Sequence, residues 1–307
     1  MSDAAHTNIR EGSSLYYSLL WTDPLAKDRV DQRLALIKAL ITTLDDVQEP
    51  QVAEKKIHWW HEELQRLHEG TARHPATQQN QEALKGLGLA HATCLDLLSA
   101  VSTQRFTPFE KTDASNANLT LNFQSRMALL AHALSNETSD LDTSSHPASS
   151  ALAFAHYEQL ARLPNLLHRG LPVFSNEVYT QFQIRPDDLA RHIRIAQPCE
   201  QEDAAASSSR QSAQSRLKSI PVVSEKAGRR QLLVHAIECN RISLQEALDD
   251  QAVTQRYRHA PLLPLWRLLV LRKHQLDLWQ KRQPDLLRER ITLTPLSKFF
   301  RAWQNRR

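Results

Sequence analysis

Apolar residues recur along this chain at spacings of three and four, which is the period of an amphipathic α-helix. Two such stripes stand out, the first at Leu34, Ile37, Ile41 and Leu44 and the second at Ile57, Trp60, Leu64 and Leu67. Few segments alternate with the period of two that a half-buried strand requires. The pattern predicts an all-α chain, with helices over residues 12–20, 27–47, 52–70, 82–101, 118–134, 151–167, 229–247 and 264–281 and a further helix opening at Pro186.

Proline and polar stretches mark the expected breaks between these helices. Pro50 has no backbone N–H and biases Glu49 away from helical geometry, so one helix ends before it and another begins after it. Pro164 is expected to kink or end its helix in the same way. Polar loops are expected over residues 71–79, 105–115 and 135–150, and residues 173–184 are the least helical part of the chain.

The predicted domain organisation is a single domain over residues 13–307 that follows a disordered N-terminus, residues 1–12. A chain of 307 residues is long enough to bury a sizeable core. Residues 197–228 are rich in Ser, Ala and Gln, which is typical of a low-complexity segment. We expect this segment to be a partly disordered insertion within the domain.

The cysteine pattern and the lengths of the apolar runs indicate the cellular compartment in which we expect the protein. The cysteines Cys94, Cys199 and Cys239 are scattered without a C-x-x-C pair, which favours a reducing compartment and no structural zinc site. The N-terminus has no apolar signal core, and no run approaches the roughly 20 apolar residues of a membrane span. We therefore expect a cytoplasmic protein, either free in solution or peripheral on the inner membrane.

The net charge of +4 is unevenly distributed along the chain. Residues 256–307 hold 13 Lys or Arg against 3 Asp or Glu, and the C-terminus mixes basic with aromatic residues. Three interpretations remain open: an ordinary solvated helix face, contact with an anionic membrane, and binding to nucleic acid. A solvated face and membrane contact are both favoured over binding to nucleic acid.

Four segments carry a resemblance to a known family. An acidic stretch before Pro50 is followed by K-x-x-W-W-x-E-E-L, and an S-x-Y-Y segment lies upstream at Tyr16 and Tyr17. Leu160–Leu189 and the R-x-R-I-x-L-x-x-L-x-K pattern at Arg288–Lys298 lie downstream. In order and spacing these segments resemble the squalene/phytoene synthase family across nearly the whole chain. The resemblance implies a class I trans-isoprenyl diphosphate synthase-like helical bundle around a central cavity.

Active members of this family join two prenyl diphosphates head to head, and Mg²⁺ neutralises the departing diphosphate. The resemblance implies one aspartate-rich motif on each of two facing helices, because Mg²⁺ prefers carboxylate oxygens. Aligned on Pro50 and Trp60, the first motif keeps Asp45 and Asp46 but has Ile41 and Thr42 in place of its earlier carboxylates. A shifted register using Asp45, Asp46 and Glu49 misplaces Pro50, so we favour the first alignment.

The second metal motif differs more from the family pattern than the first motif does. Aligned without gaps on Arg169-Gly170, its positions fall on Glu158, Arg162, Asn165 and Leu166. A guanidinium stays protonated and cannot coordinate Mg²⁺, so Arg162 is expected to pair with Asp45 or Asp46 across the cavity. Segment 160–170 is most similar to a divergent branch that includes a mitochondrial complex I assembly factor, in which the resemblance implies that the aspartate motifs are lost.

The resulting hypothesis is a non-catalytic family member that binds an isoprenoid or lipid-like ligand and acts with a protein partner in assembly. The alternative is an active Mg²⁺-dependent prenyltransferase of the squalene or phytoene synthase type, with Asp45 and Asp46 as metal ligands. Its candidate catalytic residues are Asp45, Asp46, Glu49 and Glu158. Candidate substrate-binding residues in either case are Tyr16, Tyr17, Trp60, Arg162, His168 and Arg169.

The remaining sequence patterns give weaker indications of a functional site. His58 and His61 have the spacing of two metal ligands, but with no third ligand we favour exposed polar residues. The chain has no phosphate-cradling glycine loop, nucleophile elbow or Cys/His catalytic pattern.

Overall fold

The computed structural model describes residues 8–45, 47, 49–106, 109–171, 173–196, 222–289 and 291–306. Every regular element within these residues is helical, which confirms the predicted all-α class. In chain order the α-helices are α1 (Ser14–Ser18), α2 (Pro24–Ile41), α3 (Pro50–Glu69), α4 (Pro75–Gln78), α5 (Gln81–Leu84), α6 (Gly88–Phe106), α7 (Thr112–Ser135), α8 (Ala148–Ala161), α9 (Leu163–His168), α10 (Asn176–Gln181), α11 (Pro186–Ala196), α13 (Val222–Asp249), α14 (Gln251–Tyr257), α15 (Leu263–Arg282) and α16 (Pro295–Gln304). Two short 3₁₀ turns, η1 (Thr138–Leu141) and η2 (Thr143–Ser145), join α7 to α8.

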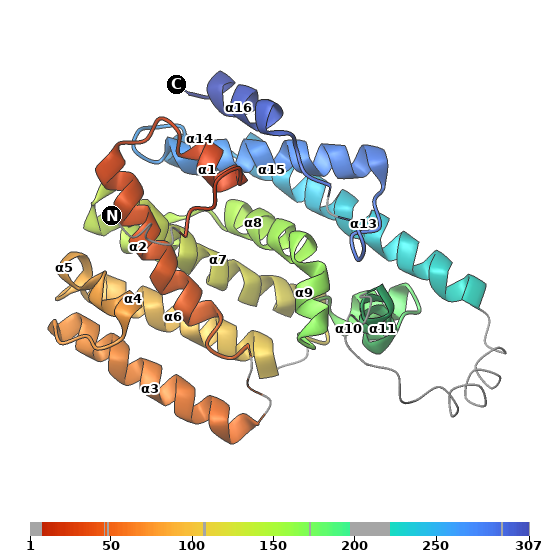
Figure 1. Ribbon diagram of the computed structural model, residues 1–307, viewed down its shortest axis with the longest axis horizontal. Helices are drawn as coiled ribbons and strands as arrows, with labels where there is room; N and C mark the ends of the chain where they lie inside the picture. The colour runs from red at the N-terminus through yellow and green to blue at the C-terminus, as the bar shows by residue number, and fades with distance from the viewer. Residues whose placement is uncertain are drawn as a thin grey trace, which may run out of the picture.

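Helix α7 lies at the centre of the bundle and packs against α2, α6 and α8 (Figure 1). On one side, α3 packs against α6. On the other side, α13 packs against α8 and α15, and α1 and α16 both lie on α15. The helices therefore form successive layers on the two sides of α7.

Two hydrophobic clusters fill these layers. The first joins apolar side chains of α7, α8, α13 and α15, and the second joins those of α2, α3 and α6. Leu130 of α7 packs against both clusters, so this helix links the two. Each fully buried leucine contributes about 1.5–3 kcal/mol to folding.

The end of α2 differs from the prediction and repositions Asp45. The helix ends at Ile41, so the expected helix through residue 47 was wrong. Thr42 Oγ1 donates to the Lys38 carbonyl at 2.8 Å, and Thr43 Oγ1 accepts the Trp60 Nε1 hydrogen at 2.6 Å. The second contact ties residue 43 to α3. Asp45 consequently lies in a turn beyond the helix and not in its last turn.

The predicted break at Pro164 is confirmed. Helix α8 ends at Ala161, and α9 begins at Leu163 with the proline in its first turn, where no N–H is needed. Arg162 is the residue between the two helices. It therefore lies at a bend in the chain.

Three further expectations change. The stretch expected to be least helical contains α10. Residues 222–228, expected in the low-complexity insertion, belong to α13, whereas residues 197–221 lie outside the described part of the chain. Residues 8 and 9, expected in the disordered N-terminus, lie against α2, where their backbone N–H groups donate to Asp31 Oδ1 at 2.5 and 3.0 Å, whereas residues 1–7 are not described. Among the described helices, none has the combined length and apolarity needed to cross a bilayer.

Candidate functional site

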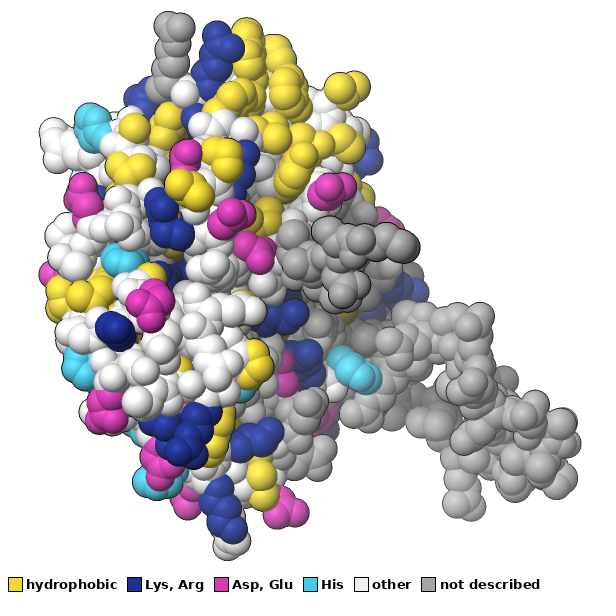
Figure 2. Space-filling view, turned by 60° about the vertical axis from the view of Figure 1, so that its left-hand side comes forward, with side chains coloured by type: hydrophobic (Ala, Val, Ile, Leu, Met, Phe, Trp, Pro, Cys, Tyr) yellow, Lys and Arg dark blue, Asp and Glu magenta, His cyan; other side chains and the backbone are white. Residues whose placement is uncertain are grey.

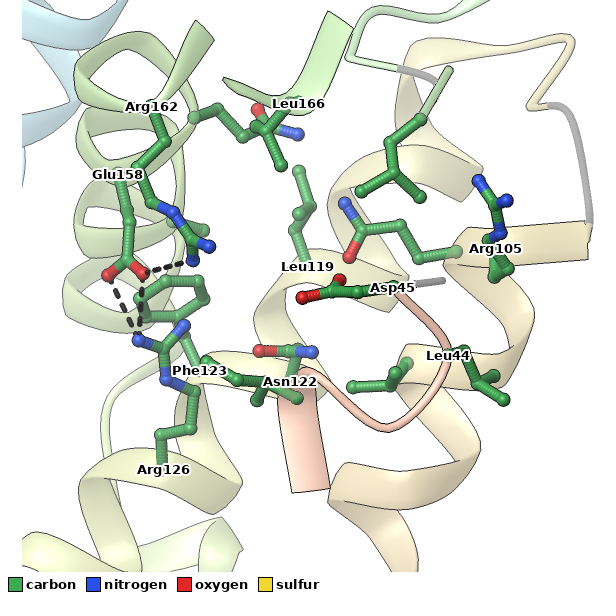
Figure 3. Close-up of a pocket in the computed structure, with 16 residues that line it drawn as sticks. Leu44, Asp45, Arg105, Leu119, Asn122, Phe123, Arg126, Glu158, Arg162 and Leu166 are labelled. Carbon is green, nitrogen blue, oxygen red and sulfur yellow. Dashed lines mark hydrogen bonds and ion pairs between the residues drawn. The ribbon is translucent and has the colours of Figure 1, made fainter. Parts of the chain in front are cut away.

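A pocket of about 670 Å³, counting the part open to solvent, lies where the end of α2 meets α6, α7, α8 and α9. We call it the arginine pocket. Its apolar walls include Ile41, Leu44, Leu119, Phe123 and Leu166. Its ionisable lining residues are Asp45, Arg105, Arg126, Glu158 and Arg162 (Figure 3). The two segments that we aligned with the metal motifs of the family thus face one pocket.

Glu158 of α8 is the centre of an arginine cluster. Arg126 Nη2, from α7, lies 2.9 and 3.0 Å from the two Glu158 carboxylate oxygens. Arg162 Nη1 donates to the same carboxylate at 3.2 Å, and Arg272 Nη2 of α15 lies 4.0 Å from it. One carboxylate therefore faces three guanidinium groups, which come from α7, from the end of α8 and from α15.

The electrostatics of the cluster keep Glu158 ionised. Burial alone would raise the pKa of this carboxyl, but the charges of Arg126, Arg272 and Arg162 outweigh burial and lower the pKa to about 2. The guanidinium of Arg126 lies 4.0 Å from the centre of the Phe123 ring, and that of Arg272 lies 4.8 Å from the centre of the Tyr157 ring. The Phe123 contact holds the Arg126 guanidinium at the pocket, whereas Arg272 reaches Glu158 from α15 without lining the pocket.

Asp45 lies on the facing wall, in the turn after α2 (Figure 3). Its carboxylate forms an ion pair with Arg169, the residue that follows α9. Arg105 supports this contact, because its guanidinium donates to the Arg169 carbonyl at 3.1 Å and to the Val47 carbonyl at 2.9 Å. Two arginines thus hold the turn against α9.

The predicted pairing of Arg162 with Asp45 is wrong. Arg162 contacts Glu158, four residues earlier, because residues at this spacing lie on the same helix face. The partner of Asp45 is Arg169, which reaches it from the end of α9. Asp46, the other expected partner, lies outside the described residues.

Among the described residues, the charge balance of the pocket is positive. Five guanidinium groups line it or contact its carboxylates, those of Arg105, Arg126, Arg162, Arg169 and Arg272, against the carboxylates of Asp45 and Glu158. Guanidinium groups form strong, directional hydrogen bonds with phosphate oxygens. The arrangement is therefore suited to an anionic group.

Over the part of the chain that the structure describes, the donor set of the pocket does not fit the Mg²⁺ ions that the family resemblance implies. Mg²⁺ requires about six oxygen ligands in octahedral geometry. Asp45 and Glu158 already contact guanidinium groups, whose charges oppose a nearby cation. Over the described residues, no group of three or more His, Cys, Asp or Glu side chains is placed to hold a metal ion.

A second pocket adjoins the first and shares Leu119 and Gln159 with it. We call it the apolar pocket, since it is lined mainly by carbon atoms of residues such as Leu160, Val173, Phe174, Val178 and Leu232. Asn240 of α13 is 2% exposed at this pocket, and its Oδ1 atom has no hydrogen-bond partner among the described residues. A buried, unpaired amide oxygen is costly unless a ligand or water contacts it.

The other predicted residues lie away from the arginine pocket. Tyr16 and Tyr17 contact each other on α1, which packs on α15 and α16. Trp60 is buried in the hydrophobic cluster around α3, and its indole holds Thr43 rather than facing the pocket. His168 is exposed at the end of α9, and Glu49 is the exposed N-cap residue of α3.

The two histidines considered as metal ligands are also exposed. His58 and His61 both lie on the outer face of α3, and His58 Nε2 lies 3.2 Å from Glu62 Oε1. This placement agrees with the favoured interpretation of exposed polar residues.

Three arginines of the site were missed from the sequence: Arg105, Arg126 and Arg272. Arg272 directly follows the apolar run Leu268–Leu271, and a charge beside such a run is a usable sign of burial. Arg126 and Arg105 carry no such local sign, because their roles depend on which helices meet.

No family model matches this chain, and a search of curated proteins also finds no match. Membership of the squalene/phytoene synthase family therefore stays a prediction from the segments quoted above.

Proposed function

We propose that this chain is a non-catalytic protein of the squalene/phytoene synthase type that binds an isoprenoid or lipid bearing a phosphate or diphosphate. One observation carries the proposal: among the described residues, both carboxylates of the arginine pocket are bound to guanidinium groups, Glu158 to Arg126 and Asp45 to Arg169. The resemblance implies that active relatives place Mg²⁺ here. In this chain, arginine side chains supply the positive charge.

The two adjoining pockets support a division of the ligand into head and tail. The arginine pocket offers guanidinium groups to phosphate oxygens, and the apolar pocket offers carbon atoms to a hydrocarbon chain. Since Leu119 and Gln159 line both pockets, one ligand can extend from the first to the second. Long prenyl chains and acyl chains share this chemistry.

The donor set also supports the absence of catalysis. Ionising a prenyl diphosphate requires strong neutralisation of the departing diphosphate, which metal ions provide in the active family. Arginines bind a diphosphate, but here Asp45 and Glu158, the candidate carboxylates that the structure places at the pocket, are already paired with guanidinium groups. The bound ligand is therefore held without being converted.

Titration calorimetry in buffer containing EDTA tests this proposal, with farnesyl diphosphate and short-chain phosphatidic acid as the two probes. The proposal predicts binding of at least one probe, and the tighter of the two identifies the source of the phosphate. Arg126→Gln should weaken binding roughly tenfold or more, since a hydrogen bond to a charged group contributes about 1.5–3 kcal/mol. Lys55→Gln, an exposed residue on α3, is the matched control and should leave the affinity unchanged.

Two results would contradict the proposal. The first is that neither probe binds to the folded wild type. The second is unchanged affinity in both Arg126→Gln and Arg162→Gln. The Arg162 variant is included because its side chain is 35% exposed, so its replacement is not expected to disturb folding.

A further inference from the structure

Helix α16 directs an apolar face away from the protein. Leu296, Phe299, Phe300 and Trp303 are spaced at three, one and three residues, which places them on one side of a helix. Their exposed fractions are 82%, 46%, 51% and 40%. Most amphipathic helices of a globular protein turn such a face towards the core.

The opposite face fixes α16 to the bundle. Ala302 is buried, and Lys298 Nζ donates to the Gly12 carbonyl at 2.7 Å. The buried Arg267 of α15 donates to the carbonyls of Asn305 and Arg306 at 3.0 and 2.9 Å, at the C-terminal end of α16. These contacts hold the helix in one orientation, so the apolar face is a defined surface.

A neighbouring tryptophan extends this surface. Trp21, between α1 and α2, is 41% exposed, and its ring centre lies 5.9 Å from that of Phe299. We call Trp21, Leu296, Phe299, Phe300 and Trp303 the aromatic surface. Apolar side chains gather at this end of the molecule in Figure 2. Contiguous exposed apolar surfaces of this kind mark interaction sites.

The charge beside the aromatic surface favours an anionic partner. Residues 291–306 contain no Asp or Glu. Of their basic side chains, Lys298 is buried against Gly12 and Arg301 turns towards His274 of α15, whereas Arg306 lies at the aromatic surface. The Arg306 guanidinium lies 4.8 Å from the Trp303 ring centre. Tryptophan, phenylalanine and arginine together are the side chains that anchor a helix in the interfacial region of an anionic bilayer.

We propose that the aromatic surface docks on an anionic phospholipid bilayer. Phe299, Phe300 and Leu296 enter the boundary between headgroups and acyl chains, and Arg306 contacts lipid phosphates. A second copy of the chain fits less well, because a symmetric pairing through α16 brings the arginines of two copies together. The aromatic surface shares no residue with either pocket, so this inference does not depend on the proposed function.

Co-sedimentation with vesicles tests the inference, using phosphatidylcholine alone and phosphatidylcholine with phosphatidylglycerol in equal parts. The full chain should sediment with the anionic vesicles, more weakly as salt increases, and much less with the neutral ones. Phe299→Ser/Phe300→Ser should lower the partition coefficient about tenfold or more, through lost apolar burial. Arg306→Gln should lower it about fivefold, on anionic vesicles alone.

The matched control is Val52→Ser/Leu89→Ser, which alters two apolar residues of similar exposure, 42% and 48%, on α3 and α6. This control should sediment like the wild type. Circular dichroism checks that every variant is folded. Equal sedimentation of the control and the Phe299→Ser/Phe300→Ser variant would overturn the inference. It would also be overturned if the chain did not bind vesicles and instead formed a dimer that requires Phe299 and Phe300.

Discussion

Arg126 Nη2 lies within hydrogen-bond distance of both carboxylate oxygens of Glu158, at 2.9 and 3.0 Å. This contact joins the central helix α7 to α8 at the wall of the arginine pocket. It also places a permanent cation beside the carboxylate that aligns with the family's second metal motif. The stability of the fold and the proposed binding of an anion therefore depend on the same pair.

Glu158→Gln should destabilise the fold by about 2–4 kcal/mol, because it leaves Arg126, Arg162 and Arg272 close together without their shared carboxylate. Urea unfolding followed by circular dichroism measures this change. Glu54→Gln, at an exposed position of α3, is the matched control and should cost less than about 0.5 kcal/mol. Equal stability of the two variants would contradict the role given to Glu158.

Acid should destabilise the protein partly through Glu158. Its folded pKa of about 2 lies below the ordinary value of 4.5, so the unfolded chain binds the proton first as the pH falls. The stabilisation is complete above about pH 4.5 and is lost towards pH 2, and it amounts to at most about 3 kcal/mol.

The free energy of unfolding, measured across that pH range, should fall less steeply in Glu158→Gln than in the wild type. A residual slope is expected, because Glu63 also has a pKa lowered to about 2: burial raises it, but hydrogen bonds from His74, Thr77, Arg73 and Arg66 prevail. Identical slopes for variant and wild type would show that Glu158 is not held ionised by its arginines.

Asp45 and Arg169 should behave as an energetically coupled pair. A double-mutant cycle of Asp45→Asn and Arg169→Gln should give a coupling energy of about 1 kcal/mol in unfolding experiments, since both side chains are partly buried. Arg162→Gln combined with Asp45→Asn is the control cycle and should show a smaller coupling, because Arg162 contacts Glu158. A larger coupling for the Arg162 cycle would favour the pairing expected from the sequence.

Much of the helical framework follows from the sequence, because period and proline placement are local properties. The stripe through Trp60, Leu64 and Leu67 is buried as predicted, and the chain breaks at Pro164. The end of α2 was misplaced because the apolar stripe continues through Leu44, whereas the helix ends at Ile41 and Thr43 is tied to Trp60 of α3.

The site was predicted less completely than the helices. Alignment with the metal motifs placed Asp45, Glu158 and Arg162 together, and the structure brings all three to one pocket. Their pairing was not predictable, because Arg169 reaches Asp45 only through the bend between α8 and α9. Arg126 and Arg272 join the cluster through packing of α7 and α15 around α8, which no local pattern encodes.

Filling the apolar pocket should weaken binding of the hydrocarbon tail without affecting binding of the diphosphate head group. Ala236→Phe places a ring in this pocket and should weaken farnesyl diphosphate binding about tenfold, while affinity for inorganic diphosphate stays unchanged. Titration calorimetry with both ligands measures the two effects. Ala92→Phe, at an exposed position of α6, is the control for the added ring. Equal weakening of both ligands by Ala236→Phe would contradict the division into head and tail.

The most direct test of the central claim is the metal dependence of farnesyl diphosphate binding, measured by calorimetry with EDTA and with Mg²⁺, alongside an assay for released diphosphate. The account predicts binding in EDTA, no gain in affinity with Mg²⁺, and no diphosphate release above background. Binding that requires Mg²⁺, with release that Asp45→Ala abolishes, would contradict it and identify an active prenyltransferase.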